Sequence, residues 1–191
     1  MEIRGAVFSG VNNARGLVAE RAGAIRRAIG HDVVPGTLNV WLDRPVAFDN
    51  GRVRRVDGSR FGLWPARLNG SPVWVFRHDR MALHVAELVA DRNLRDALDL
   101  HDGDLVSLAV DPGLLVGIPA TGWLAWRVFW SGRTRRAFVS PAHAARARRW
   151  GRRLGATQDS VETSSPRLLA RLAAEALASA TAALTPRARS R

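Results

Sequence analysis

The chain has 191 residues, of which 47% are hydrophobic, and this suits one domain of moderate size with an appendage or two small domains. It contains neither cysteine nor lysine. Disulfides, thiolate metal sites, a P-loop with its phosphate-binding lysine, a protein-kinase site and Schiff-base chemistry are therefore excluded. If the protein handles phosphate, arginine side chains, backbone N–H groups and a metal ion must do so.

The formal net charge of +12 is unevenly distributed. Residues 1–110 carry 15 arginines against 13 acidic residues, whereas residues 111–191 carry 14 arginines against 4 acidic residues. The N-terminus lacks the charged start and apolar run of a signal peptide. The most hydrophobic window, residues 105–126, is interrupted by Asp111, prolines and glycines. We therefore expect no membrane span and a cytoplasmic location.

The first predicted elements are a strand, a polar loop and a helix. Residues 3–8 predict a strand that ends at Ser9-Gly10, and a polar loop follows as far as Gly16. Residues 17–29 predict an amphipathic helix, which Gly30 ends. A loop between a strand and a helix can present backbone N–H groups to an anion.

A turn and a strand follow. Pro35 fixes its own φ and Gly36 tolerates almost any φ, so the two predict a sharp turn. In the strand after it, one face carries Leu38, Val40 and Leu42, and the other carries Thr37, Asn39 and Trp41. A hydroxyl and an amide two residues apart form part of a ligand set that Mg²⁺ accepts, with waters and substrate phosphates completing it. The alternative is that both side chains only satisfy backbone groups of the turn.

The next segments predict a small β-barrel. Residues 45–60 are interpreted as a variable excursion rich in arginine, aspartate and glycine. Asn69-Gly70 predicts a hairpin between residues 61–68 and 72–76. Further predicted elements are a strand at 83–90, a short helix at 93–100, a turn at 101–104 and a closing strand at 105–110. Several short strands with tight turns are typical of a β-barrel.

Glu87 stands out within the predicted strand 83–90, where it shares a face with Leu83, Val85 and Val89. A carboxylate on an apolar face is costly unless it has a partner. The alternative is that Glu87 faces solvent or lies at a bulge. His84 is placed in the same strand and interpreted as an ordinary hydrogen-bonded imidazole, because the five histidines have no zinc-like spacing.

The character of the chain changes beyond residue 110. Three tryptophans and Phe129 gather within residues 123–130, and the segment that follows is rich in arginine. We predict two domains, a barrel over 1–110 and a basic extension over 111–191 that is largely helical from about residue 141. The extension is expected to be separable from the chemistry. Nine arginines near several tryptophans in residues 127–153 also suit nucleic acid, but a solvated basic helix is the favoured interpretation.

Three segments, taken in order, resemble a known family. They are the Ser9-Gly10 loop, the sequence Pro-Gly-Thr-Leu-Asn at 35–39, and residues 86–89 followed by 93–95 and 102–104. Over roughly residues 3–110 the chain resembles the CTP-dependent riboflavin kinases, known chiefly from archaea. The resemblance implies a mainly β fold, a six-stranded cradle-loop (RIFT-like) β-barrel with short internal helices. It also implies transfer of the γ-phosphate of CTP to riboflavin, giving FMN and CDP.

The resemblance also implies site residues. Mg²⁺ would be held by Thr37 and Asn39, and Glu87 would lie at the flavin near the acceptor hydroxyl as the catalytic residue. Asp79 would lie at the flavin, where the family has a threonine. The nucleotide would be bound by Gly10, Val11, Asn12, Asn13, Ala14 and Arg15 along its phosphates and by Arg92, Asn93, Leu94 and Arg95 at the cytosine nucleotide.

The sequence departs from the family in two places. The family loop reads Gly-x-Gly-x-Gly, whereas side chains at Asn12 and Ala14 limit the approach of this backbone to a phosphate. Asp79 adds a carboxylate that repels a phosphorylated product. The alternatives are therefore a kinase for another small alcohol and a non-catalytic nucleotide- or flavin-binding barrel. The oligomeric state is left open.

Overall fold

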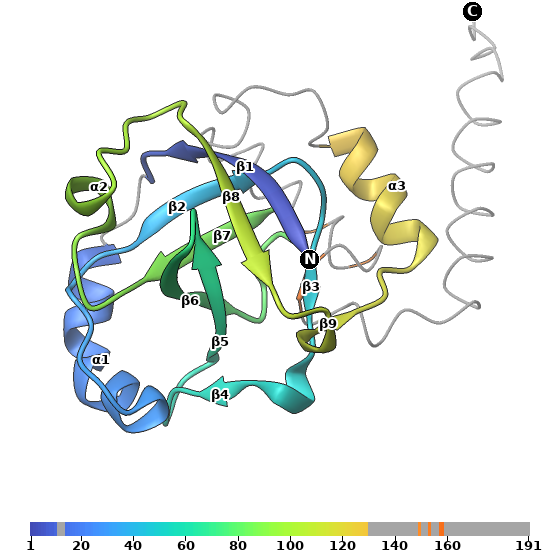
Figure 1. The fold of residues 1–191 in the computed structure, drawn as a ribbon. Coiled ribbons are helices and arrows are strands. Elements are labelled where there is room, and N and C mark those ends of the chain that lie inside the picture. The colour runs from blue at the N-terminus through green and yellow to red at the C-terminus, as the bar shows by residue number, and fades with distance from the viewer. Residues whose placement is uncertain (11–13, 130–148, 150–152, 154–156, 159–191) are drawn as a thin grey trace, which may run out of the picture.

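The computed structural model describes residues 1–10, 14–129, 149, 153, 157 and 158 (Figure 1). Its strands are β1 (Glu2–Phe8), β2 (Leu38–Leu42), β3 (Ala47–Phe48), β4 (Arg54–Arg55), β5 (Phe61–Leu68), β6 (Ser71–His78), β7 (Val85–Val89), β8 (Leu105–Val110) and β9 (Leu115–Val116). Its helices are α1 (Ala14–Ile29), α2 (Leu94–Ala97) and α3 (Ala120–Phe129), with 3₁₀ turns η1 (Asn50–Arg52) and η2 (Pro112–Leu114).

Six antiparallel strands form a closed barrel. The order β5-β6-β7-β2-β1-β8 runs through hydrogen-bonded neighbours, and β8 pairs back with β5 from Ala66 opposite Val110 to Leu68 opposite Leu108. Strand β4 adds to the outer edge of β5, and β3 pairs with β9 in a separate two-stranded sheet. The predicted mainly β, six-stranded barrel with short helices is confirmed.

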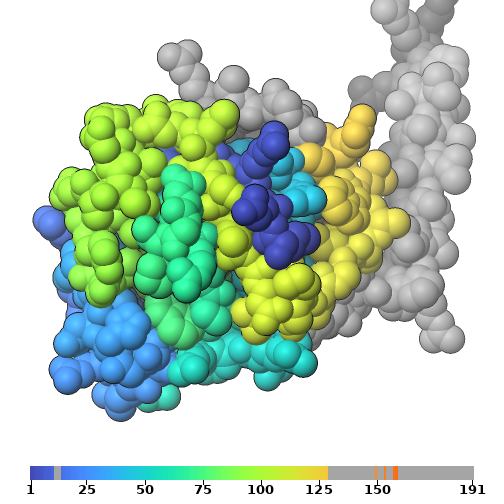
Figure 2. Space-filling model, viewed as in Figure 1, coloured from blue at the N-terminus to red at the C-terminus, as the bar shows by residue number. Residues whose placement is uncertain are grey.

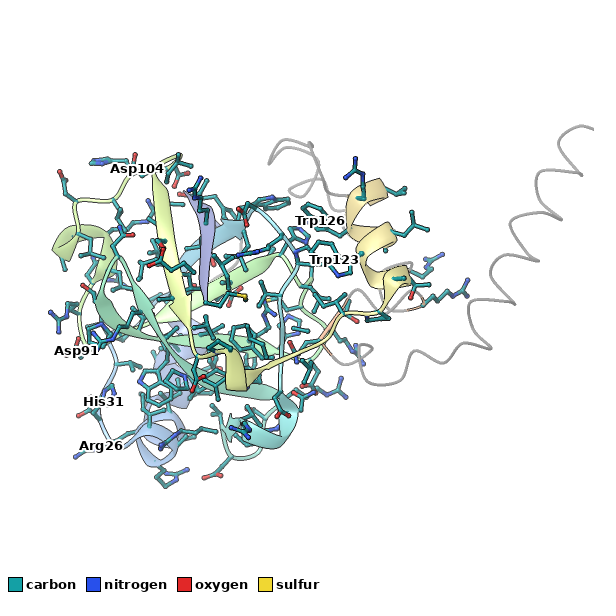
Figure 3. All side chains as sticks on the ribbon, turned by 45° about the vertical axis from the view of Figure 1, so that its right-hand side comes forward. Arg26, His31, Asp91, Asp104, Trp123 and Trp126 are labelled. Carbon is teal, nitrogen blue, oxygen red and sulfur yellow. The ribbon has the colours of Figure 1, made fainter. Side chains whose placement is uncertain are left out.

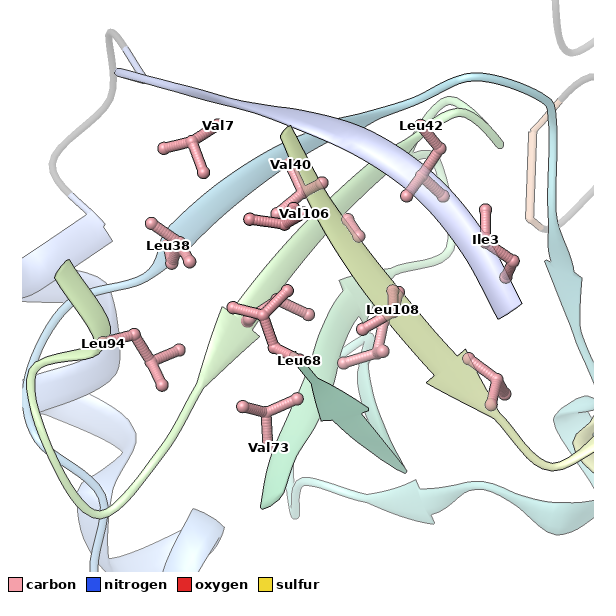
Figure 4. Packing of buried hydrophobic residues seen from close by; sticks show 14 of the residues in the cluster. Ile3, Val7, Leu38, Val40, Leu42, Leu68, Val73, Leu94, Val106 and Leu108 are labelled. Carbon is pink, nitrogen blue, oxygen red and sulfur yellow. The ribbon is translucent and has the colours of Figure 1, made fainter. Parts of the chain in front are cut away.

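The core of the molecule fills the barrel (Figure 4). Side chains alternate between the two faces of a strand, so every second residue points inward. On β2 these residues are Leu38, Val40 and Leu42, as predicted, and they are buried with residues of the other barrel strands. Outside the barrel, α1 packs Val18 and Ile25 into a second cluster with residues of β5, β6 and β7. The outward-facing side chains of β2 and β7 are therefore the ones available for chemistry.

The predicted turns are present where the backbone requires them. Asn69 and Gly70 have φ values of 47° and 84°, the left-handed conformations of a two-residue hairpin turn. Gly36 has a φ of 128°, which favours glycine, and together with Pro35 it forms the bend that precedes β2. Gly30, with a φ of 86°, ends α1 as expected.

Three sequence-based assignments are wrong. Residues 14–16, predicted as loop, form the first turn of α1. The excursion at 45–60 contains β3, η1 and β4, because Phe48 is buried and packs its ring 5.1 Å from that of Trp64. His84 lies in a turn before β7 and not in the strand. In the excursion, tertiary packing outweighs the local composition.

Residues 111–129 hold structure that the sequence did not predict, namely η2, β9 and α3. The space-filling view shows α3, in yellow, on the flank of the barrel beside the N-terminus, in dark blue (Figure 2). The helical part of the extension, expected from about residue 141, lies almost entirely outside the described residues, and the domain boundary near residue 110 stays a prediction. Among the described helices, none has the length and apolar character needed to cross a membrane.

Candidate active site

Asn39 and Glu87 face each other across two neighbouring strands. In the sheet register, Phe8 of β1 pairs with Asn39 of β2, Asn39 pairs with Glu87 of β7, and Glu87 pairs with Phe76 of β6. Because paired residues point to the same face, an amide and a carboxylate lie side by side between two aromatic rings. The Thr37 hydroxyl joins them by donating to Asn39 Oδ1 at 3.4 Å.

A cavity of about 190 Å³ opens beside this group. Its walls come from the start of β2, the end of β7, α1 and α2. Its polar lining consists of Arg15, Thr37, Arg92, Asn93 and Arg95. Three guanidinium groups and neutral polar side chains in one cavity suit a phosphorylated ligand, since arginine binds phosphate by charge and by paired hydrogen bonds.

The three cavity arginines are held differently. Arg92 pairs with Asp91 at 2.8 Å, and Arg95 pairs with Asp102 at 2.8 Å. No ion pair to Arg15 is found among the described residues. Arg15, in the first turn of α1, is therefore the cavity arginine whose charge is most available to a ligand.

Asp102 ties α2 to the end of β1. Its carboxylate accepts hydrogen bonds from the backbone N–H and the hydroxyl of Ser9, at 3.0 and 3.1 Å, and from Arg95 Nη2. Burial acts to raise the pKa of Asp102, but the hydrogen bonds from Arg95 and Ser9 outweigh it and lower the pKa. The ionised Asp102 thus fixes Arg95 at the cavity and places Ser9-Gly10 beside Asn39.

Gly10 allows this close approach. A β-carbon at position 10 would lie 2.6 Å from Asn39 Nδ2, well inside van der Waals contact. A side chain there would displace the Asn39 amide, which is one of the two oxygen donors of the group. The glycine is therefore required by packing against Asn39, in addition to any contact with a ligand.

The environment of Glu87 favours its neutral form. Burial raises the pKa of Glu87 to about 7, and the charge of Arg77 acts in the opposite direction. Among the described residues, no hydrogen bond or ion pair joins another side chain to this carboxylate. A carboxylate with a pKa near neutrality can take a proton from a hydroxyl group and release it again.

Arg77 is wholly buried on the strand next to β7. Its guanidinium donates to the backbone carbonyls of Val46 at 2.7 Å, Leu83 at 3.2 Å and Val85 at 2.5 Å, and to Gln158 Oε1 at 3.3 Å. Burial lowers the pKa of Arg77, to about 9, which leaves it protonated at neutral pH. A fixed buried cation therefore holds the segment that leads into β7.

Thr37 and Asn39 fit a magnesium ion. Two ligands on adjacent corners of an octahedron with bonds of 2.0–2.1 Å lie about 3 Å apart, and Thr37 Oγ1 and Asn39 Oδ1 are 3.4 Å apart. Thr37 also lines the cavity, where phosphate oxygens would complete the shell. The described residues contain no cluster of three or more histidine, cysteine or acidic side chains placed to bind a metal, so an ion here would depend on substrate oxygens.

Comparison with known proteins places this arrangement in a family. The model of the CTP-dependent riboflavin kinases, described as domain of unknown function DUF120, matches residues 7–110, which is more than half of the chain. The chain belongs to the CTP-dependent riboflavin kinase family. These proteins are phosphotransferases with an alcohol acceptor.

Riboflavin kinases of archaea are similar to the chain in sequence. The protein of Aeropyrum pernix is 30% identical over 123 residues, which cover 53% of this chain and 89% of the relative. That of Pyrococcus abyssi is 34% identical over 123 residues, covering 56% and 58%. That of Thermoplasma acidophilum is 29% identical over 124 residues, covering 56% of each. The chain therefore spans just over half the length of the last two.

The structure gathers most of the residues that the family resemblance implied. Arg15, Thr37 and the segment 92–95 line one cavity, Asn39 accepts a hydrogen bond from Thr37, and Glu87 pairs with Asn39 across the sheet. Val11, Asn12 and Asn13 lie outside the described residues, and Ala14 begins α1. Asp79 is not part of the cavity lining and pairs instead with Arg55 at 3.2 Å.

Three residues of the site were missed by sequence reasoning. Ser9 and Asp102 were seen only as parts of a loop and a turn, although together they hold Arg95. Arg77 was not singled out at all. The available signal was that Arg77 lies on the same face of β6 as Val73 and Val75, two apolar residues at the same spacing.

The two buried titratable groups near the site give opposite pH dependence to the stability of this kinase-family protein. Burial, and secondarily the charge of Arg77, lowers the pKa of His84 from 6.5 to about 3. Its contribution to stability is present above pH 6.5 and is lost as the pH falls toward 3. The pKa of Glu87 is raised from 4.5 to about 7, so its contribution is present below pH 4.5 and is lost as the pH rises through 7.

Glu87→Gln should therefore change the pH profile of unfolding in a defined way. At about pH 8 the variant should be more stable than the parent by on the order of 1–3 kcal/mol, because a buried charge is removed. Between pH 6.5 and 4.5 its stability should fall more steeply than that of the parent, by up to about 1.4 kcal/mol per pH unit, because only His84 then titrates. Urea unfolding in EDTA across this range measures both, and parallel profiles would contradict the assignment.

Proposed function

We propose that this protein transfers the γ-phosphoryl group of a nucleoside triphosphate, CTP by family, to a hydroxyl group of riboflavin. The supporting observation is the adjacency of the arginine-lined cavity to the group formed by Thr37, Asn39 and Glu87. The cavity suits the triphosphate, and the group lies at one side of it. In the family's terms the barrel is of the cradle-loop type, with the nucleotide over residues 10–15 and 92–95.

Each residue has a role in this reaction. Arg15, Arg92 and Arg95 offset the charge of the phosphates and orient them. Glu87 accepts the proton of the attacking hydroxyl group while the hydroxyl oxygen bonds to the γ-phosphorus. The bond between the γ-phosphorus and the β-phosphate oxygen breaks at the same time, and CDP is released. Thr37 and Asn39 would hold Mg²⁺, which when bound neutralises phosphate charge. Asp79 is assigned to the acceptor side by resemblance alone.

We expect CTP to be preferred over ATP and GTP as the donor. The reason is the family membership together with the place of the segment 92–95, which lines the cavity. Each nucleotide would be incubated with riboflavin and Mg²⁺, and the products followed by mass spectrometry. Equal turnover with CTP and ATP, or turnover with ATP alone, would show the preference to be wrong.

The same measurement tests the proposed function itself. Other small alcohols are included as acceptors, because the carboxylate of Asp79 departs from the family threonine. Formation of FMN from riboflavin supports the proposal, and a product from another alcohol alone would change the acceptor. Tight binding of CTP or riboflavin without any turnover would instead favour the non-catalytic binding barrel. Contact between the basic extension and nucleic acid stays an untested alternative, since most of residues 127–153 lie outside the described residues.

A further inference from the structure

The C-terminal extension packs on the barrel beside the proposed reaction centre. Ala125 and Trp126 of α3 join a cluster with barrel residues on the outer face, and Trp126 projects from α3 toward the barrel (Figure 3). We call this group the α3 cluster; it consists of Phe8, Trp41, Met81, Ala82, Val85, Ala125 and Trp126. The family match ends at residue 110, so α3 lies beyond the part of the chain that the family model covers.

The α3 cluster borders the pair of Asn39 and Glu87 directly. Phe8 pairs with Asn39 in the register of β1 and β2. Trp41 lies two residues after Asn39, and Val85 lies two residues before Glu87, which places both on the same outer face about 6.5 Å along their strands. On that face of β2 and β7, no other residue lies between the α3 cluster and the pair of Asn39 and Glu87.

The arginine-lined cavity lies on the opposite side of the same pair. Its lining includes Thr37, two residues before Asn39, and Leu88, one residue after Glu87. Phosphoryl transfer requires the attacking and leaving oxygens to lie roughly in line on opposite sides of the phosphorus. If the nucleotide occupies the cavity, the α3 cluster lies on the side of the pair from which the acceptor hydroxyl can approach.

The chemistry of the cluster suits a planar ring. Phe8 and Trp41 meet edge to face with ring centroids 5.9 Å apart. Trp126 is partly buried, and its buried indole Nε1 has no hydrogen-bond partner among the residues that the structure describes. Buried N–H groups are nearly always paired, so this donor among aromatic rings is available to an acceptor atom on a flat ring.

The extension returns to this cluster at a second point. Thr157 forms a β-bridge with Ala82, and the backbone N–H of Gln158 donates to the Met81 carbonyl at 3.3 Å. The Gln158 side chain is 2% exposed and exchanges two hydrogen bonds with the backbone of Phe48, at 2.6 and 3.2 Å. Two separate parts of the extension are therefore built onto the 81–85 segment that leads to Glu87.

We propose that α3 forms one wall of the acceptor site and that Trp126 contacts the planar ring of the acceptor. The inference rests on the proposed function and adds to it that the extension helps to determine acceptor specificity. The ligand class is a planar aromatic alcohol that carries hydrogen-bond acceptors on its ring, as riboflavin does. The packing of Ala125 and Trp126 also favours a folded unit that includes α3 over one that ends at residue 110.

The test compares two positions of helix α3 in the full-length protein. Trp126→Ala should raise the KM for riboflavin about tenfold or more and leave the KM for CTP within about twofold, because a stacked aromatic contact and a hydrogen-bond donor are lost. Leu124→Ala is the matched control. Leu124 lies on the same helix, is 59% exposed and is not part of the α3 cluster, so both KM values should stay at parental levels. Quenching of flavin fluorescence reports riboflavin binding independently of turnover.

A second variant distinguishes a lost ligand contact from a folding defect. Trp126→Phe keeps a ring in the α3 cluster but removes the N–H, and riboflavin affinity should fall about two- to tenfold, as expected for one hydrogen bond. Parental riboflavin affinity in both Trp126 variants, or an equal rise in the KM for CTP, would overturn the inference alone. A parent protein that neither binds nor phosphorylates riboflavin would overturn the proposed function with it.

Discussion

Glu87→Gln is expected to lower turnover by about two to four orders of magnitude, the usual contribution of a positioned acid or base. Glutamine keeps the shape and the hydrogen-bonding reach of glutamate but cannot take the proton of the acceptor hydroxyl. Affinity for CTP and riboflavin should change much less, because neither ligand depends on the proton transfer. Steady-state kinetics and calorimetric titration of the same preparation measure the two effects.

Glu20→Gln is the matched control for this substitution. Glu20 lies on the exposed side of α1, where it pairs with Arg21, and its loss should leave turnover unchanged. Under the alternative of a non-catalytic binding barrel, the parent shows no turnover and Glu87→Gln can change only affinity. Parental turnover in Glu87→Gln would show that Glu87 has no catalytic role. It would not contradict the kinase activity, because a loose phosphoryl-transfer transition state needs little help from a base.

Much of the barrel could be predicted because its signals are local. Alternation gave the inward face of β2, and Asn69-Gly70 gave the hairpin between β5 and β6. The same alternation placed Thr37 and Asn39 together on the other face, where they meet at 3.4 Å. The faces of a strand are fixed by its own sequence, so these predictions needed no knowledge of the neighbouring strands.

The composition of the site depends on register, which the sequence does not fix locally. That Asn39 lies opposite Glu87 follows from the pairing of β2 with β7, elements separated by four other strands or strand fragments along the chain. A shift of one residue would have put Glu87 inside the barrel. The sequence showed that the carboxylate was costly on an apolar face but not which group it would meet.

Buried polar contacts made by distant segments were also beyond prediction. Arg77 donates to the carbonyls of Val46, Leu83 and Val85 and to Gln158, which is 81 residues away along the chain. Helix α3 was not predicted either, and the aromatic residues within 123–130 were noted only as a group. It is held by the contacts of Ala125 and Trp126 with the barrel, which helical propensity does not reveal.

Replacing Thr37 by valine together with Asn39 by leucine should abolish most magnesium-dependent nucleotide binding. Both substitutions keep apolar or β-branched side chains suited to a strand while removing the two oxygen donors that lie 3.4 Å apart. Loss of groups that merely orient metal ligands costs about 10–100-fold in affinity, so loss of the ligands themselves should weaken binding of Mg·CTP by about a hundredfold or more. Isothermal titration calorimetry measures this effect.

The control is the same titration of CTP with EDTA in place of Mg²⁺. The cavity arginines remain in the double variant, so the weak metal-free affinity should match that of the parent if the defect is confined to the metal site. A double variant that binds Mg·CTP as tightly as the parent would show that Thr37 and Asn39 only satisfy the Pro35-Gly36 turn. Equal weakening with and without Mg²⁺ would instead show that the two side chains support the cavity wall rather than an ion.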